Sequence, residues 1–113
     1  MRLVTRKEWG ARPPTSKTPF VRTRLEGVAV HYSASDADEQ ARHENCAGRV
    51  RAIQAFHMSP AAGGGEGPWA DIAYNWLACK HGYVFQGRGW LVRSAAQGTN
   101  EGNERYHAVC FLG

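Results

Sequence analysis

The chain has 113 residues, and its 14 Lys and Arg against 10 Asp and Glu give a net charge of +4 and a pI of about 9.3. One domain of ordinary globular composition fits this length, with 42% hydrophobic and 21% charged residues, so wholesale disorder is excluded. No apolar run approaches the roughly 18 residues of a membrane-spanning helix, and Arg2, Arg6, Lys7 and Glu8 occupy the place of a signal peptide's hydrophobic core. We therefore expect a chain that is made in the cytoplasm and has no membrane partner.

The positive charge suits a polyanionic partner but does not identify one. Arginine and lysine are scattered, with a mild cluster over 17–24, and no basic stretch alternates with aromatic residues that could stack on bases. We therefore expect no nucleic-acid partner.

The first 20 residues predict an extended N-terminal arm, because Pro13 and Pro14 remove hydrogen-bond donors and exclude helix. Residues 27–32 form a short run rich in β-branched and aromatic side chains that is apolar on both alternations. This pattern predicts a buried central strand that ends at a polar site.

A helix is predicted over residues 38–58, which contain neither proline nor a turn dipeptide and carry an apolar stripe at helical spacing. Ser35 or Asp36 can cap it. The apolar stripe of this helix consists of Cys46, Val50, Ile53 and His57.

The Gly- and Pro-rich segment 59–68 predicts a flexible loop without a packed element.

The second half of the chain predicts strands. Two of them, at 72–79 and 83–86, flank the turn Lys80-His81-Gly82 and form a β-hairpin. A loop over 87–103 leads to a last strand at 106–112. Together with the long helix, these strands predict a single domain of the α/β (α+β) class, with a central mixed β-sheet and packed helices.

Three cysteines, Cys46, Cys79 and Cys110, are widely spaced and contain no C-x-x-C pair. Neither a disulfide framework nor a zinc knuckle is indicated. Buried reduced thiols are the simpler interpretation.

The five histidines contain no H-x-x-x-H or H-E-x-x-H spacing, so any metal site has to be assembled by the fold. His31 lies where chemistry is usual, at the carboxyl end of a strand. Packing accounts for His57 and His107, and His43 is expected in solvent. Tyr74 is a second candidate, for which packing with a satisfied hydroxyl is the alternative to a catalytic role.

Five motifs follow one another and together cover most of the chain. They are WGARPP at 9–14, VAVHYSA at 28–34, RAIQAFHM at 51–58, WADIAYNW at 69–76 and GYVFQGRG at 82–89. This order resembles that of the type 2 N-acetylmuramoyl-L-alanine amidases, the family of phage lysozyme-like amidases and peptidoglycan recognition proteins. The resemblance implies a partial amidase-like domain over 1–113, similar to phage endolysin domains, that is made in the host cytoplasm and acts on the bacterial cell wall.

The resemblance also implies zinc-dependent hydrolysis of the amide bond between N-acetylmuramic acid and L-alanine of peptidoglycan. His31 corresponds to the first zinc ligand and Tyr74 to a tyrosine whose hydroxyl assists at the scissile amide. A metal with an open position activates water, and a nearby phenol can hydrogen-bond the developing oxyanion. Trp69 and Asp71 match positions that shape the fold. We expect His31 and Tyr74 in one shallow groove, with 59–68 on its rim.

The sequence departs from the family pattern toward its end. The family's last helix, and the segment with its second histidine and a cysteine or aspartate ligand, lie beyond the strand at 106–112, and this sequence stops at Gly113. Gln97 stands where many members carry a histidine, and His107 receives no ligand role. Since a catalytic zinc needs three protein ligands plus water, we expect an incomplete Zn²⁺ site and little hydrolysis by this chain alone.

The leading hypothesis is an N-acetylmuramoyl-L-alanine amidase, either as a piece of a longer enzyme or with ligands from another chain. The alternative is a non-catalytic module that binds muropeptides of bacterial peptidoglycan. The last strand is apolar on both alternations, and the predicted helix can cover only one side. We therefore expect an exposed apolar sheet face through which the chain self-associates or takes a partner chain.

Overall fold

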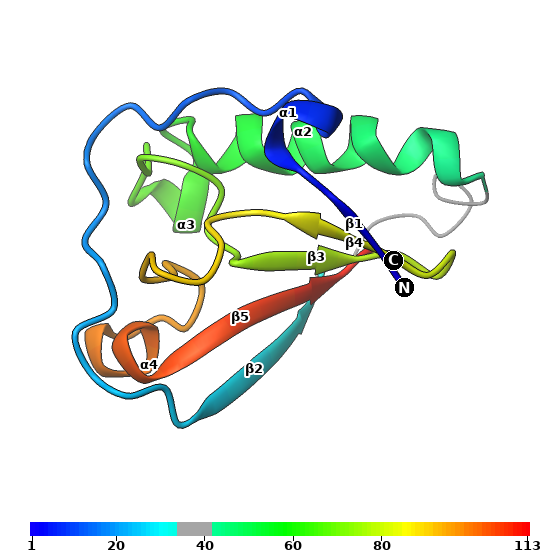
Figure 1. Ribbon diagram of the computed structural model, residues 1–113. Coiled ribbons are helices and arrows are strands. Elements are labelled where there is room, and N and C mark those ends of the chain that lie inside the picture. Colours follow the sequence, from blue (N-terminus) through cyan, green and yellow to red (C-terminus); the bar gives the residue numbers. More distant parts are fainter. Residues whose placement is uncertain (34–41) are drawn as a thin grey trace.

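The computed structural model describes residues 1–33 and 42–113, which contain a five-stranded sheet with the order β1-β4-β3-β5-β2 (Figure 1). β3 and β4 pair antiparallel, and the other neighbouring strands pair parallel. The strands are β1 (Arg2–Val4), β2 (Gly27–Tyr32), β3 (Trp76–Ala78), β4 (Tyr83–Gln86) and β5 (Tyr106–Phe111). This mixed sheet with packed helices confirms the predicted fold class.

Helices α1, α2 and α3 lie on one face of the sheet, and α4 lies beside the start of β5 (Figure 1). The helices are α1 (Arg6–Trp9), α2 (Cys46–His57), α3 (Ala62–Gly65) and α4 (Asn100–Arg105), with a 3-10 turn η2 (His43–Asn45) before α2. The core residues include Trp9, Val50, Ile53, Leu77, Phe85 and Cys110. No helix in the described part of the chain is both long and apolar enough to cross a membrane.

Helix α2 buries the predicted stripe. Its buried residues are Cys46, Val50, Ile53, Gln54 and His57. Gln54 was not predicted to be buried, and its amide is satisfied because it donates to Arg12 O and to Asp71 Oδ1 and accepts from Arg12 N. Regular structure before α2 begins at His43, while the predicted start and caps over 35–38 lie outside the described residues.

The N-terminal 20 residues contain more regular structure than the predicted extended arm. β1 adds a parallel edge strand beside β4. Thr5 caps α1 by accepting from Glu8 N, while the Glu8 carboxylate accepts from Thr5 N, and Gly10 ends the helix at φ 77°. The prediction is therefore wrong for residues 6–9, where this capping box stabilises a helical turn, while residues 2–4 are extended. Residues 11–19, with the two prolines, contain neither helix nor strand.

Two predicted loops also contain short helices. Within 59–68, α3 forms a single turn and buries Ala62 completely, so this segment holds a packed residue that its composition did not predict. Within 87–103, Thr99 caps α4 by accepting from Gly102 N. The flexibility of 59–68 stays a prediction.

β2 lies at an edge of the sheet, so its predicted central position is wrong. Val28, Val30 and Tyr32 point to solvent and are 58%, 69% and 74% exposed, while Ala29 and His31 are partly buried. An edge strand with a bare outer face has the same apolar pattern as a strand covered on both faces. Because Ala29 pairs with buried Ala108 and His31 with buried Cys110, His31 lies on the core side of the sheet.

Candidate functional site

His31 and Tyr74 come together at the carboxyl end of β2. His31 is the fifth residue of that strand, and Tyr74 lies two residues before β3. Their ring centroids are 5.5 Å apart and their planes are tilted by 49°. The two side chains are therefore close together as predicted, but only Tyr74 lines the pocket on this side of the sheet. Their roles in zinc binding and catalysis stay predictions.

Gln97 selects one tautomer of the neutral His31 ring. Gln97 Nε2 donates to Ser94 Oγ and to Tyr106 O, both at 3.0 Å. Its Oε1 therefore faces His31 Nε2 as an acceptor, at 2.6 Å. This network assigns the ring proton of neutral His31 to Nε2 and leaves a lone pair on Nδ1. Sequence reasoning identified Gln97 only as a replacement for a histidine and did not predict this contact.

Tyr74 is a neutral hydrogen-bond donor. Burial, followed by the neighbouring Cys110 thiol, raises the pKa of the Tyr74 phenol well above its ordinary value. Burial also raises the pKa of the Cys110 thiol, to about 11. The pair is therefore fully protonated at neutral pH, and Tyr74 can offer its O–H to a carbonyl oxygen but does not act as a phenolate.

His57 is the third ring of the site, at 5.4 Å from the Tyr74 ring centroid. Its Nδ1 accepts the backbone N–H of Ala73 at 2.9 Å, which confirms the prediction of a satisfied, buried histidine. Burial and then the positive charge of Arg88 lower the pKa of His57 to about 4. At neutral pH His57 is thus uncharged, with its proton on Nε2.

A pocket of about 450 Å³ lies beside these rings. One wall is apolar and comes from α2, and the polar groups include the Arg49 guanidinium, His57 and Tyr74. The lining residues are Ser33, Arg49, Ala52, Ile53, Phe56, His57 and Tyr74. Since none of these residues belongs to 59–68, the predicted position of that segment on the rim is wrong: helix α2 occupies that side of the pocket.

The described residues do not complete a zinc site at His31. A catalytic zinc needs three protein ligands and an open position. Among residues 1–33 and 42–113, His31 does not belong to a group of three side chains that could hold a metal, and the one such group consists of His43, Cys46 and Cys79. Zinc therefore does not fit at His31 on the described residues alone.

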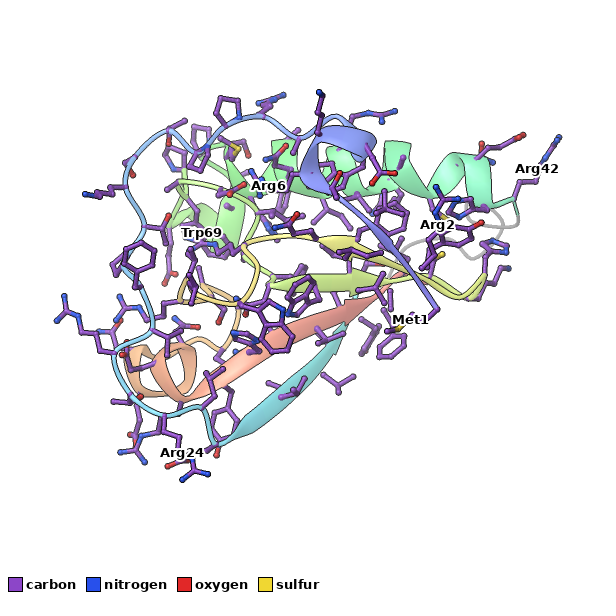
Figure 2. The ribbon with its side chains drawn as sticks, in the orientation of Figure 1. Met1, Arg2, Arg6, Arg24, Arg42 and Trp69 are labelled. Carbon is purple, nitrogen blue, oxygen red and sulfur yellow. The ribbon has the colours of Figure 1, made fainter. Side chains whose placement is uncertain are left out.

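Asp71 and Trp69 have the structural role that was predicted for them: they form hydrogen bonds and packing contacts next to the site. Asp71 is 3% exposed and accepts hydrogen bonds from Arg6, from Gln54 and from its neighbour Ile72 N. An ion pair of 2.9 Å links it to Arg6. The Trp69 ring lies 5.1 Å from the His57 ring, and Figure 2 shows Trp69 on the side of the sheet that carries α2 and α3.

The structure confirms the predicted environment of His107 but not that of His43. His107 is 2% exposed and its Nε2 lies 2.9 Å from Trp90 O, which confirms a packing role. His43 is half-buried and stacks on Tyr83 at 3.6 Å, so its predicted position in solvent is wrong. The long-range contact between η2 and the hairpin has no signal in the local sequence.

No protein-family model matches the chain, but similar proteins exist. Peptidoglycan-recognition protein SC2 of Drosophila simulans is 35% identical over 98% of this chain and 54% of the relative. The N-acetylmuramoyl-L-alanine amidase of Mus musculus is 32% identical over 96% of this chain and 19% of the relative. The chain thus spans about half the length of the insect relative it matches.

Solved structures agree with these relatives. Drosophila peptidoglycan recognition protein SD superposes with a TM-score of 0.84 and 30% identity, over 100% of this chain and 61% of that one. A complex of tracheal cytotoxin with the ectodomains of PGRP-LCa and PGRP-LCx matches with a TM-score of 0.80 and 28% identity, over 100% of this chain and 62% of that one.

The homologues of this chain are therefore members of the peptidoglycan recognition protein and N-acetylmuramoyl-L-alanine amidase family, and the chain has their fold. The insect and mouse relatives are animal proteins, so the similarity to phage endolysins stays a prediction.

Proposed function

We propose that this chain binds muramyl peptides of bacterial peptidoglycan in the pocket beside His31 and Tyr74. The observation that carries the proposal is that Tyr74, His57 and Arg49 line one pocket of about 450 Å³, with the His31 ring adjoining Tyr74. One structural neighbour is a receptor complex with tracheal cytotoxin, and a relative is named for peptidoglycan recognition. We also propose the bacterial cell wall as the place where the chain acts.

The chemistry of the pocket suits a stem peptide. Such a peptide offers amide carbonyls, carboxylates and small alkyl side chains. The neutral rings of His57 and Tyr74 can donate to carbonyl oxygens, and the Arg49 guanidinium can pair with a carboxylate. The apolar wall of α2, including Ile53 and Phe56, accommodates alkyl groups.

Amide hydrolysis is the second candidate, because the Tyr74 ring lies 5.5 Å from the His31 ring, whose Nδ1 is left open by Gln97. We propose this activity for a form of the protein in which further metal ligands come from outside the described residues. The contribution of Tyr74 is to donate its O–H to the carbonyl oxygen of the amide as negative charge develops there.

Calorimetric titration with a muramyl tripeptide tests binding. We expect saturable binding by the 113-residue chain in the presence of a chelator, and at least about 10-fold weaker binding for Arg49→Ala and Tyr74→Phe, since each removes one charged or buried hydrogen bond. Arg24→Ala is the matched control, because Arg24 is exposed and does not line the pocket. Equal binding by all three variants would contradict the proposed pocket.

Mass spectrometry of mixtures prepared with Zn²⁺ and without a chelator separates the two candidates. Release of free stem peptide, lost on addition of a chelator, would support hydrolysis by this chain. Binding without release would support the binding module.

A further inference from the structure

Three potential metal ligands gather where the start of α2 meets the β3–β4 turn. His43 lies in η2, Cys46 is the first residue of α2, and Cys79 directly follows β3. Their ligand atoms all lie within 4.8 Å of one another. Figure 2 marks this end of the molecule with the label of Arg42, which precedes η2.

The spacing of these atoms suits a tetrahedral metal. Zinc binds thiolate sulfur at about 2.3 Å and imidazole nitrogen at about 2.0–2.1 Å, so two ligands on one ion lie roughly 3.5–3.8 Å apart. His43 Nδ1 lies 3.8 Å from Cys79 Sγ. This separation equals the longest of these ligand–ligand distances.

The three side chains are held in place by the fold. The His43 ring stacks on Tyr83, with centroids 3.6 Å apart and planes only 16° from parallel. Cys79 N donates to Tyr83 O, and Gly82 N donates to Cys79 O, so the turn fixes the cysteine backbone. Cys46 is wholly buried against the sheet. Ligands from two rigid elements need little rearrangement to close on an ion.

Other roles explain this arrangement less well. Cys46 is wholly buried, whereas a reactive nucleophilic cysteine is partly exposed. A disulfide between Cys46 and Cys79 would leave no reason for His43 Nδ1 to face a sulfur atom. Both cysteines are free thiols in this structure.

We propose that His43, Cys46 and Cys79 bind one thiophilic divalent metal ion of the Zn²⁺ type. A water molecule or His81, whose ring centroid lies 5.9 Å from that of His43, supplies the fourth ligand. None of these residues lines the pocket beside Tyr74, so the site is separate from the proposed peptidoglycan site. Metal binding at this site joins the start of α2 to the β3–β4 turn.

Cobalt substitution tests the site directly in the reduced, intact chain. Co²⁺ added to the metal-free protein is expected to give a thiolate-to-cobalt charge-transfer band in the near ultraviolet and intense visible bands of a tetrahedral ion. These bands should saturate at one equivalent and disappear when Zn²⁺ is added. The wild-type spectrum needs no variant, so it decides the question even if Cys46→Ser does not fold.

Matched variants assign the ligands. Cys79→Ser and His43→Ala should bind Co²⁺ at least about 100-fold more weakly, because loss of even an outer-shell partner reduces metal affinity about 10–100-fold. Cys110→Ser, which removes the third buried thiol, and His31→Ala should keep the bands. The proposal is overturned if the wild-type chain gives no thiolate band, if Cys79→Ser keeps it, or if His31→Ala loses it.

Discussion

Gln97 Oε1 accepts a hydrogen bond from His31 Nε2 at 2.6 Å, and the two protons of the Gln97 amide go to Ser94 Oγ and Tyr106 O. A rotation that exchanged the oxygen and nitrogen of the Gln97 amide would break these hydrogen bonds. His31 is therefore held in one tautomer by residues that lie on either side of α4 in the sequence, and the open nitrogen is Nδ1.

Replacing Gln97 with leucine should release this tautomer. In the wild-type chain, ¹⁵N NMR of the imidazole rings should show His31 with a protonated Nε2 and an unprotonated Nδ1 at a pH where the ring is neutral. In Gln97→Leu the two nitrogen shifts should move toward each other, since both tautomers become populated. Gln86→Leu is the control, because Gln86 lies on β4, which is not a neighbour of β2. A wild-type spectrum with the proton on Nδ1 would contradict the assignment.

His57 should make the stability of the chain depend on pH. Its pKa is about 4 in the folded state, below the ordinary value of 6.5, so the unfolded chain binds a proton first as the pH falls. Stability is then fully present above about pH 6.5 and is lost between that pH and 4. From these two pKa values, the free energy of unfolding should be about 2 kcal/mol lower at pH 5 than at pH 7.5.

Urea denaturation at both pH values, in metal-free buffer, measures this difference. His57→Gln keeps a side-chain acceptor for Ala73 N but no longer titrates, so its pH dependence should be smaller by that amount. His81→Gln, a change in the hairpin turn, should retain the wild-type difference. Equal pH dependence in the wild-type and His57→Gln chains would show that another group carries it.

The parts of the fold that sequence reasoning predicts well are those with a local periodic signal. The stripe of Cys46, Val50, Ile53 and His57 follows from helical spacing alone, and all of its members are buried. The hairpin follows from two apolar runs around Gly82, which has φ 83°. Such patterns depend on neighbours along the chain, so the sequence contains the information.

The missed features depend on contacts between distant segments. β2 is an edge strand because, among the described strands, it pairs only with β5, and Val28 and Val30 are exposed because no described layer covers them. The local pattern of apolar residues records neither of these facts. The contact of Gln97 with His31 joins a loop to a strand 66 positions away, and the stacking of His43 on Tyr83 joins two elements on either side of α2. His31 and Tyr74 were paired through resemblance to a family rather than through spacing.

Removing the Asp71 carboxylate should strongly destabilise the chain. Asp71 is 3% exposed, and its ion pair with Arg6 has side chains that are 4% and 23% exposed. Asp71→Ala leaves the Arg6 charge and the Gln54 amide without this acceptor, which should lower the free energy of unfolding by about 3–5 kcal/mol. Urea denaturation at pH 7.5 measures the loss.

The control for this prediction is Glu44→Ala. The ion pair of Glu44 with Arg42 is mostly exposed, at 64% and 74%, and its loss should not change the midpoint measurably. A similar small effect for Asp71→Ala would mean that the buried network contributes little to stability.

The outer face of the sheet should drive self-association. The strand register places Val28, Val30 and Tyr32 of β2 on the same face as Phe111 of β5 and Leu3 of β1, and all five are at least half exposed. The exposed apolar face lies mainly on β2, which also adds an unpaired edge among the described strands. On β5 the expectation holds only for Phe111, because Trp90 covers His107 and Val109 is partly buried. Sedimentation equilibrium should show a mass that rises with concentration for the wild-type chain.

Val30→Lys should reduce this rise in mass, because it places a charge in the middle of the face. Leu91→Lys should not reduce it, since Leu91 is equally exposed but lies in a loop. A wild-type chain that stays monomeric at all concentrations would contradict self-association through this face.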